Sequence, residues 1–140
     1  MYNNCAKFGR NIICYEKAIS SDFGTVNFGG GGSVGYKIDE NFDLQVDSIN
    51  LHEFIYYNNL EKPTYLKIDI EGSEYTFFEE KVTNDKFFST VKNIFLEFHH
   101  NDGKNLNNII DRCKKLGYHL TCDDENCVNN NVGFLLFTKL

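Results

Sequence analysis

The stretch from residue 64 to residue 82 constrains the fold more than any other part of the chain. Residues 64–70 favour a β-strand, and residues 73–82 favour a helix that begins after Gly72. Glycine suits such a junction because it adopts positive φ and lets other groups approach closely. If strands and helices alternate along the rest of the chain, the sheet should be mostly parallel and covered on both faces.

The other segments continue this alternation. Asn50 and Glu53 occupy the positions of a capping box, and Asn105 and Gly117 flank an amphipathic stretch. The further elements that we expect are strands at residues 11–19, 25–28, 93–99, 118–122 and 132–139, and helices at 51–58 and 106–116. No helix separates the last two strands, so they should form an antiparallel pair at the edge of the sheet.

Length and composition narrow the class of protein. The chain has 140 residues, enough for one domain, and its 41% hydrophobic and 15% aromatic content predicts a packed core. The net charge is −6 and no Lys/Arg cluster is present, which argues against nucleic acid and anionic membranes as partners. No apolar run approaches the roughly 20 residues of a membrane span.

The cysteines and the N-terminus indicate a compartment. The five cysteines are an odd number and match no common disulfide framework, so we expect reduced thiols. The spacing of Cys122 and Cys127 is too loose to assign a zinc site, and no metal ligands are assigned. The first ten residues lack the apolar stretch of a signal peptide. A cytoplasmic location is the expectation.

Three carboxylates, Asp69, Glu71 and Glu74, stand at the junction between the strand at residues 64–70 and the helix that follows it. Lys67, Asp69 and Glu71 share one face of this strand, because side chains alternate. Ligands of open parallel sheets bind beyond the carboxyl ends of the strands. A polar ligand would explain these charges, but so would an exposed edge strand followed by acidic residues at a helix N-terminus, where Glu71 and Glu74 are favourable. The pattern leaves both explanations open.

A second group of polar residues ends the strand at residues 93–99. Glu97, His99 and His100 occur there. If the two strands are neighbours, Asp69, Glu71, Glu97 and His99 face one crevice. The alternatives are that Glu97 pairs with Lys67 across the strands and that both histidines are exposed loop residues.

Four motifs together resemble the FkbM-type methyltransferases. The specific one is LKIDIEGSE, followed about 20 residues later by IFLEFH. CYEKAISSDFGTVNF and VDSINLHEF are similar to earlier parts of that family, and the resemblance covers roughly residues 11–100. It implies an α/β, Rossmann-like class I methyltransferase fold with strand order 3-2-1-4-5-7-6 and S-adenosyl-L-methionine as the methyl donor. In that order residues 11–19 match strand 3, residues 64–70 strand 4 and residues 93–99 strand 5. The final pair matches strands 6 and 7.

The resemblance also implies roles for site residues. Asp69 would lie at the methyl-donor crevice, and Lys17 and Ala18 would border the adenine. Glu71, Glu97 and His99 would line the acceptor side. Asp69, Glu71 and His99 are the candidate catalytic residues, with His99 the better base near neutral pH. The family methylates hydroxyls of sugars, lipids or small metabolites.

The family's Asp-x-Gly-x-Asn loop has no counterpart in these 140 residues. We therefore expect residues 1–140 to form a single, N-terminally truncated methyltransferase domain that binds the cofactor weakly or not at all alone. One alternative is a non-catalytic remnant that pairs with another chain, or self-associates, through an open sheet edge. The other is a Mg²⁺ or Mn²⁺ enzyme that uses Asp69, Glu71, Glu97 and His99.

Overall fold

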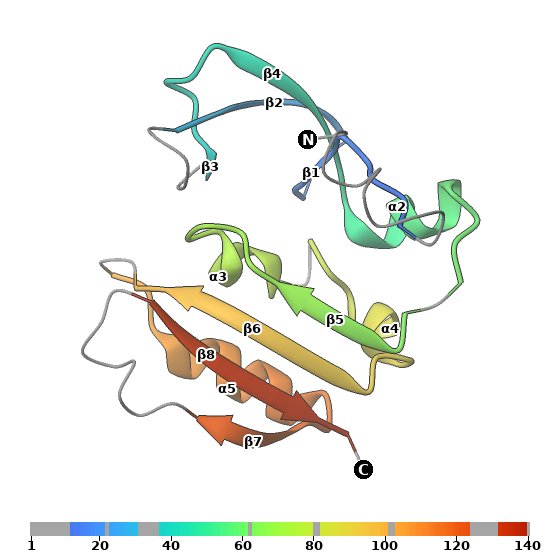
Figure 1. Cartoon of the computed structure of the whole chain (residues 1–140), viewed down its shortest axis with the longest axis vertical. Coiled ribbons are helices and arrows are strands. Elements are labelled where there is room, and N and C mark those ends of the chain that lie inside the picture. The colour runs from blue at the N-terminus through green and yellow to red at the C-terminus, as the bar shows by residue number, and fades with distance from the viewer. Residues whose placement is uncertain are drawn as a thin grey trace.

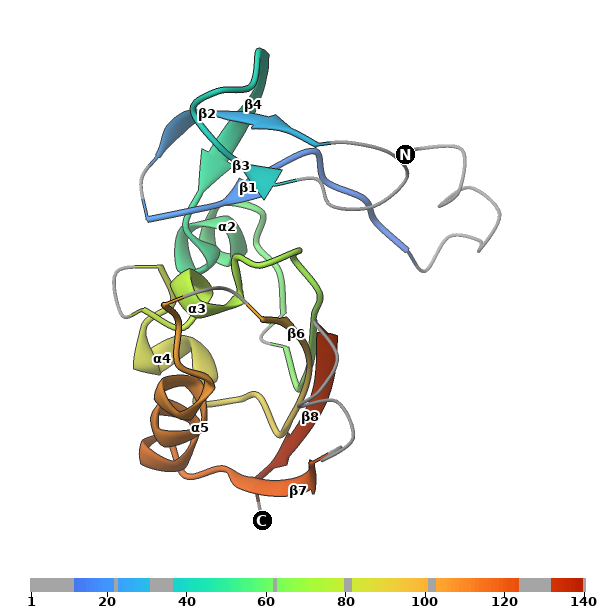
Figure 2. The same ribbon diagram turned by 90° about the vertical axis from the view of Figure 1, so that its left-hand side faces the viewer.

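The structure is a computed structural model and contains two four-stranded sheets (Figure 1). It describes residues 12–21, 23–30, 37–61, 63–79, 82–100, 103–123 and 132–139. In Figures 1 and 2 the first sheet lies beyond the β5 side of the second. The chain completes the first sheet before it begins the second, so each sheet is built from one continuous part of the sequence.

The first sheet has the strand order β1-β4-β2-β3. Its strands are β1 (Ala18–Ile19), β2 (Gly24–Gly29), β3 (Lys37–Ile38) and β4 (Leu44–Ile49). The strand expected at residues 11–19 is therefore reduced to two residues, and β3 and β4 were not predicted. Charged and polar positions such as Gln45 and Asp47 interrupt the apolar pattern of β4, and both of these residues are exposed.

Helix α2 (Leu51–Tyr57) follows β4 and confirms the predicted cap. Oδ1 of Asn50 accepts a hydrogen bond from the Glu53 N–H at 2.9 Å, and the Asn50 side-chain amide donates to Glu53 Oε2 at 2.7 Å. The first bond satisfies a backbone N–H that a free helix N-terminus leaves without a partner, and the second joins the two side chains.

The second sheet has the strand order β5-β6-β8-β7. Its strands are β5 (Tyr65–Ile68), β6 (Asn93–His99), β7 (His119–Asp123) and β8 (Val132–Thr138). This order equals the 4-5-7-6 part of the order implied by the resemblance. The antiparallel pairing of β7 with β8 is confirmed.

The expectation of a mostly parallel sheet is wrong. In the described part of the chain each sheet is mixed, with one parallel pair, β1–β4 or β5–β6, and two antiparallel pairs. Parallel neighbours need a long crossover connection, whereas antiparallel neighbours need only a turn. The crossover between β5 and β6 contains helices, whereas only residues 124–131 separate β7 from β8 in the sequence.

The helix expected at residues 73–82 is reduced to the single turn α3 (Glu74–Phe77), and a further single turn, α4 (Asp85–Phe88), was not predicted. Asn84 caps α4, since its Oδ1 accepts from the Phe87 N–H at 3.1 Å. Asparagine in this position competes with helix continuation by bonding to nearby backbone groups. The helix expected at residues 106–116 is confirmed as α5 (Leu106–Lys115), which begins after Asn105 and ends before Gly117.

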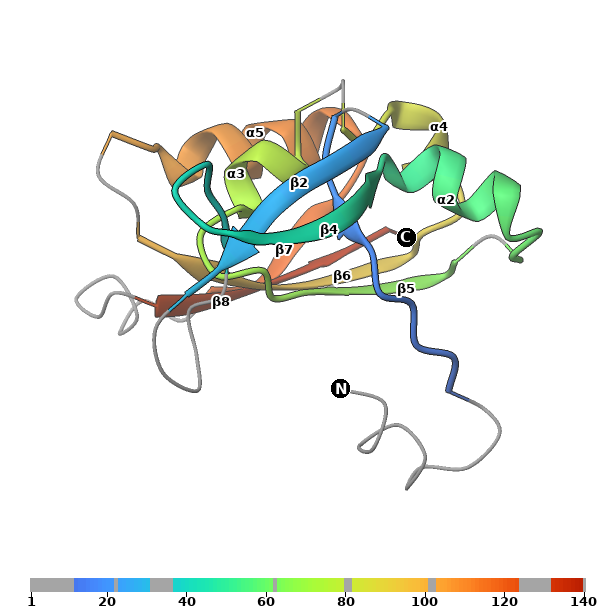
Figure 3. The ribbon, with the colours of Figure 1, turned by 90° about the horizontal axis from the view of Figure 1, so that it is seen from above.

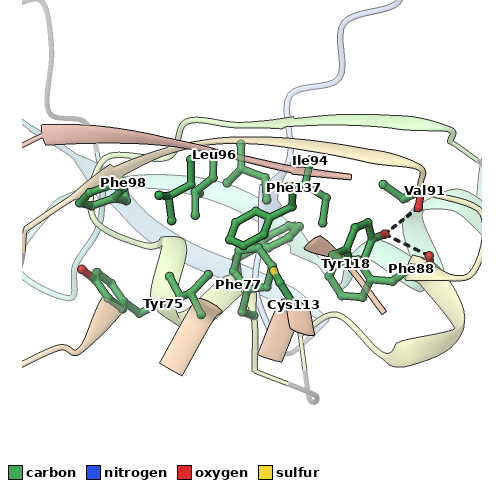
Figure 4. Close-up of a cluster of buried hydrophobic side chains, with 14 of the residues drawn as sticks. Tyr75, Phe77, Phe88, Val91, Ile94, Leu96, Phe98, Cys113, Tyr118 and Phe137 are labelled. Carbon is green, nitrogen blue, oxygen red and sulfur yellow. Dashed lines mark hydrogen bonds between the residues drawn. The ribbon is translucent and has the colours of Figure 1, made fainter. Parts of the chain in front are cut away.

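The main core lies between the second sheet and α3, α4 and α5, which cover one face of that sheet (Figures 2 and 3). Ile94, Leu96 and Phe98 alternate along β6 and are at most 2% exposed. Figure 4 shows them packed with aromatic side chains of the helices and with Phe137 of β8. On the other face Tyr65 and Phe134 are exposed, so the expected coverage of both faces is not seen among the described residues.

Two further expectations concern membranes and cysteines. None of the described helices combines the length and apolar character that crossing a membrane requires. Cys14 is disulfide-bonded, so the expectation of reduced thiols is wrong for this residue, whereas Cys113 is a buried free thiol.

Candidate active site

A left-handed turn follows β5 and shapes the site. Glu71 and Gly72 both have positive φ, at 53° and 93°, and the Ser73 N–H donates to the Ile70 carbonyl at 3.2 Å. This conformation is uncommon for residues other than glycine. The chain thereby reverses at the carboxyl end of β5 and enters α3 within a few residues.

Glu74 stabilises this turn from inside. Its side chain is completely buried, and its Oε1 accepts hydrogen bonds from the N–H groups of Ile70 at 3.3 Å and Gly72 at 3.0 Å. A buried carboxylate needs such donors, because removing it from water without compensation is costly. The two backbone donors fix the position of this oxygen in the turn.

His99 lies between two carboxylates of that turn. It ends β6, the parallel neighbour of β5. Its Nδ1 is 3.1 Å from Glu74 Oε1, and its Nε2 is 3.3 Å from Glu71 Oε2. The side chain of His99 is 19% exposed and that of Glu71 is 32% exposed, so the Nε2 side of the ring lies toward the more open part of the site.

Asp69 completes the group and pairs with a lysine. Its Oδ2 lies 2.9 Å from Lys67 Nζ, and this hydrogen bond is the main reason that the pKa of Lys67 is raised. Asp69, Glu71 and His99 each offer one ligand atom, and these three atoms lie within 4.8 Å of one another. Such a set can bind a cation, an ammonium or sulfonium group, or a hydroxyl.

The structure therefore brings Asp69, Glu71 and His99 together. Glu97 lies on the same face of β6 as His99, and its charge contributes to the raised pKa of Lys67. It is not one of the three residues whose ligand atoms cluster.

The two residues expected at the adenine belong to the first sheet. Lys17 Nζ pairs with Asp47 Oδ2 at 2.7 Å, and Ala18 is buried in β1 opposite Ser48 of β4. Both line a cavity of about 520 Å³, whose walls include Tyr15 and Phe28. The contacts described for them are made with β4, not with the cluster around His99.

Glu74 was not among the predicted site residues. A signal for it exists, because Glu74, Phe77 and Phe78 follow the i, i+3, i+4 spacing of one helix face. A carboxylate in an otherwise apolar stripe indicates a buried acid with dedicated partners.

The fold and the position of the site are those of a ligand-binding α/β protein. Polar side chains converge at the carboxyl ends of two neighbouring parallel strands, the usual place for ligands of open α/β sheets. A comparison with family models gives the particular family: the methyltransferase FkbM domain matches residues 4–120. The chain belongs to the FkbM methyltransferase family, as the motifs predicted, and this membership implies S-adenosylmethionine as the methyl donor. No curated protein and no solved structure matches the sequence.

Proposed function

We propose that the protein transfers a methyl group to a hydroxyl of a sugar, a lipid or a small metabolite, with Asp69, Glu71 and His99 at the reaction site. One observation carries this proposal. Three polar groups with complementary chemistry meet at the ends of β5 and β6, in a chain of a methyltransferase family.

The residues of the site fit the cofactor. S-adenosylmethionine supplies an electrophilic methyl group on a positively charged sulfonium, and its methionine part carries an ammonium group. The carboxylates of Asp69, Glu71 and Glu74 gather at the turn, and Lys67 pairs with only one of them. The resulting negative potential favours a cation. Asp69 is the exposed member, so it is the residue that we assign to the cofactor.

The adenine is assigned to the first sheet. Lys17 and Ala18 line the cavity of about 520 Å³ together with Tyr15 and Phe28. Aromatic walls suit a flat ring, because offset stacking adds to the burial of apolar surface.

His99 is the proposed base. A histidine can accept a proton near neutral pH, and its Nε2 lies on the open side of the site. The proton would pass from the acceptor hydroxyl to Nε2. Glu71 would orient this hydroxyl, and Glu97 would line the acceptor side.

The test is an NMR titration of the ¹⁵N-labelled chain with S-adenosylmethionine, which detects weak binding as well. We expect shifts of the backbone amides of residues 17, 18 and 69–72. Asp69→Asn should weaken binding about tenfold or more, since hydrogen bonds to charged groups are worth about 1.5–3 kcal/mol. Asp111→Asn, on the exposed face of α5, is the matched control and should leave the titration unchanged. Unchanged spectra at millimolar cofactor would contradict the assignment of these residues to the cofactor in this chain.

A second candidate function uses the same three residues as ligands of Mg²⁺ or Mn²⁺. The spacing within 4.8 Å favours it, and one nitrogen with two carboxylates suits these ions. Glu97, which the sequence had added to this set, is not part of the cluster. Paramagnetic Mn²⁺ should then broaden the resonances of His99 and Asp69 at micromolar concentration, and a chelator should restore them. Weak broadening of all resonances alike would contradict a metal site at these residues.

The edge of the second sheet offers a further possibility for a partner. Among the described residues β5 pairs with β6 alone. An open strand edge can pair with another chain. We propose self-association through β5, for which light scattering should show a mass that rises with concentration, whereas a constant monomer mass would exclude it.

A further inference from the structure

We propose that Glu74 is a positioning residue for His99. Its buried carboxylate binds the proton on Nδ1 and thereby presents Nε2 to the reaction site. What Nε2 does there rests on the proposed function, but the contact itself does not.

The first argument is the burial of Glu74. Its side chain is 0% exposed, and Oε1 accepts all three of its hydrogen-bonding contacts, from Ile70, Gly72 and His99. Oε2 makes no hydrogen bond within the part of the chain that the structure describes. Closing the turn alone needs only a neutral acceptor, because two backbone N–H groups are the donors. A buried carboxylate at this place is therefore explained better by its contact with a histidine, which can carry positive charge.

The second argument is the hydrogen-bond chemistry of the ring. An ionised carboxylate can only accept, so the contact at 3.1 Å requires a proton on Nδ1. In the neutral ring, Nε2 then carries the lone pair. Its neighbour at 3.3 Å is Glu71 Oε2, which is also an acceptor. Two acceptors this close are unfavourable unless a donor group binds beside them and gives a hydrogen bond to one of them.

An acceptor hydroxyl supplies such a donor. It can give its proton to Nε2 while Glu71 lies beside it. Once Nε2 has taken the proton, the imidazolium lies between the carboxylates of Glu71 and Glu74, which stabilise its charge. The same arrangement suits the alternative cation site, because histidine ligands of metals commonly donate their second N–H to a carboxylate.

The experiment is histidine-ring ¹⁵N and ¹³C NMR over a pH series that ends with a neutral ring, with His99 assigned by His99→Gln. We expect the wild-type ring to be mainly the Nδ1–H tautomer. Glu74→Leu removes the acceptor and should convert the ring mainly to the Nε2–H tautomer. Glu74→Gln retains an oxygen acceptor and should restore Nδ1–H. Glu71→Gln is the matched control, since it changes the carboxylate on the other side of the ring and should leave the tautomer as it is.

A mainly Nε2–H tautomer in the wild type overturns the proposal, and so does a folded Glu74→Leu protein that keeps Nδ1–H. If Glu74→Leu does not fold, the ring tautomers of the wild type and of Glu74→Gln still test the proposal. The measurement needs neither cofactor nor acceptor. If the cofactor titration fails while the Nδ1–H tautomer is found, the proposed function is wrong and the positioning by Glu74 stands.

Discussion

The backbone of two residues decides where the carboxylates of the candidate active site lie. Glu71 and Gly72 are both left-handed, and this turn brings Glu71 and Glu74 to opposite sides of the His99 ring. A non-glycine residue in this conformation costs roughly 1–2 kcal/mol. The turn bears this cost at Glu71 and avoids it at Gly72.

Gly72→Ala should therefore destabilise the protein. No atom lies within 4 Å of the added Cβ, so the cost comes from the φ of 93° alone and should be about 1–2 kcal/mol. Urea unfolding followed by circular dichroism measures it. Ser73→Ala is the neighbouring control, because the Ser73 side chain makes no capping hydrogen bond, and it should change the free energy of unfolding by less than about 0.5 kcal/mol. Equal effects of both changes would show that the strain argument fails.

At the scale of elements, capping residues determine where the helices begin. Asn50, Asn84 and Asn105 each accept a hydrogen bond from a backbone N–H in the first turn of α2, α4 and α5. α3 begins at Ser73 without such a bond and is only one turn long. Its position depends instead on the buried side chains of Glu74, Tyr75 and Phe77.

Asn50→Ala should destabilise the protein by about 1 kcal/mol, the usual cost of losing an N-cap. Both bonds to Glu53 are lost. Asn107→Ala, at an exposed position of α5, should have an effect close to zero or slightly favourable, since alanine is the better helix former. Thermal unfolding compares the stabilities of the two variants. An Asn50→Ala protein as stable as Asn107→Ala would contradict the predicted contribution of the cap.

The phenol of Tyr118, the residue before β7, links distant elements. It donates to the carbonyl of Val91 at 2.7 Å and to that of Phe88 at 3.2 Å (Figure 4). Lys139 also donates to the Phe88 carbonyl, at 2.9 Å. Within the described part of the chain, the Val91 carbonyl therefore depends on the phenol more than the Phe88 carbonyl does.

Tyr118→Phe should cost about 1–3 kcal/mol, because it leaves the Val91 carbonyl buried without its donor. Tyr65→Phe is the control, since Tyr65 is 57% exposed and should lose less than about 0.5 kcal/mol. Denaturant midpoints at neutral pH distinguish the two variants. Similar midpoints would mean that water replaces the phenol.

At the scale of the whole molecule, the core of the second sheet contains weak acids as well as hydrocarbon. Burial raises the pKa of the Cys113 thiol to about 12 and also raises the pKa of the Tyr118 phenol. In the folded protein both groups stay protonated at a pH where the unfolded chain releases its thiol proton. The unfolded state then binds fewer protons, so stability falls as the pH rises.

The stability should change little up to about pH 9, the ordinary pKa of a thiol, and should then fall by about 1.4 kcal/mol per pH unit because of Cys113. Urea titrations between about pH 8 and pH 10 measure this slope. Cys113→Ala should flatten it, whatever the variant loses in packing. A wild-type protein equally stable at both pH values would disprove the expectation.

Local patterns predicted much of the second sheet and its helices. β6 was predicted with its observed bounds and α5 almost so, because both combine a clear periodicity with flanking polar or capping residues. β4 and α4 were missed, and α3 is shorter than the helix predicted at residues 73–82. In these segments the local sequence had a weak secondary-structure propensity, and packing against distant residues determined which element formed.

The order of residues is enough to place the polar side chains at the ends of β5 and β6 and, through the motifs, to identify the family. The pairing of these side chains depends on the three-dimensional fold. His99 and Glu74 are 25 residues apart, and their contact depends on the register of β5 with β6 and on the left-handed turn. The mixed sheets were decided in the same way, since strand pairing is a contact between distant segments that no local periodicity encodes.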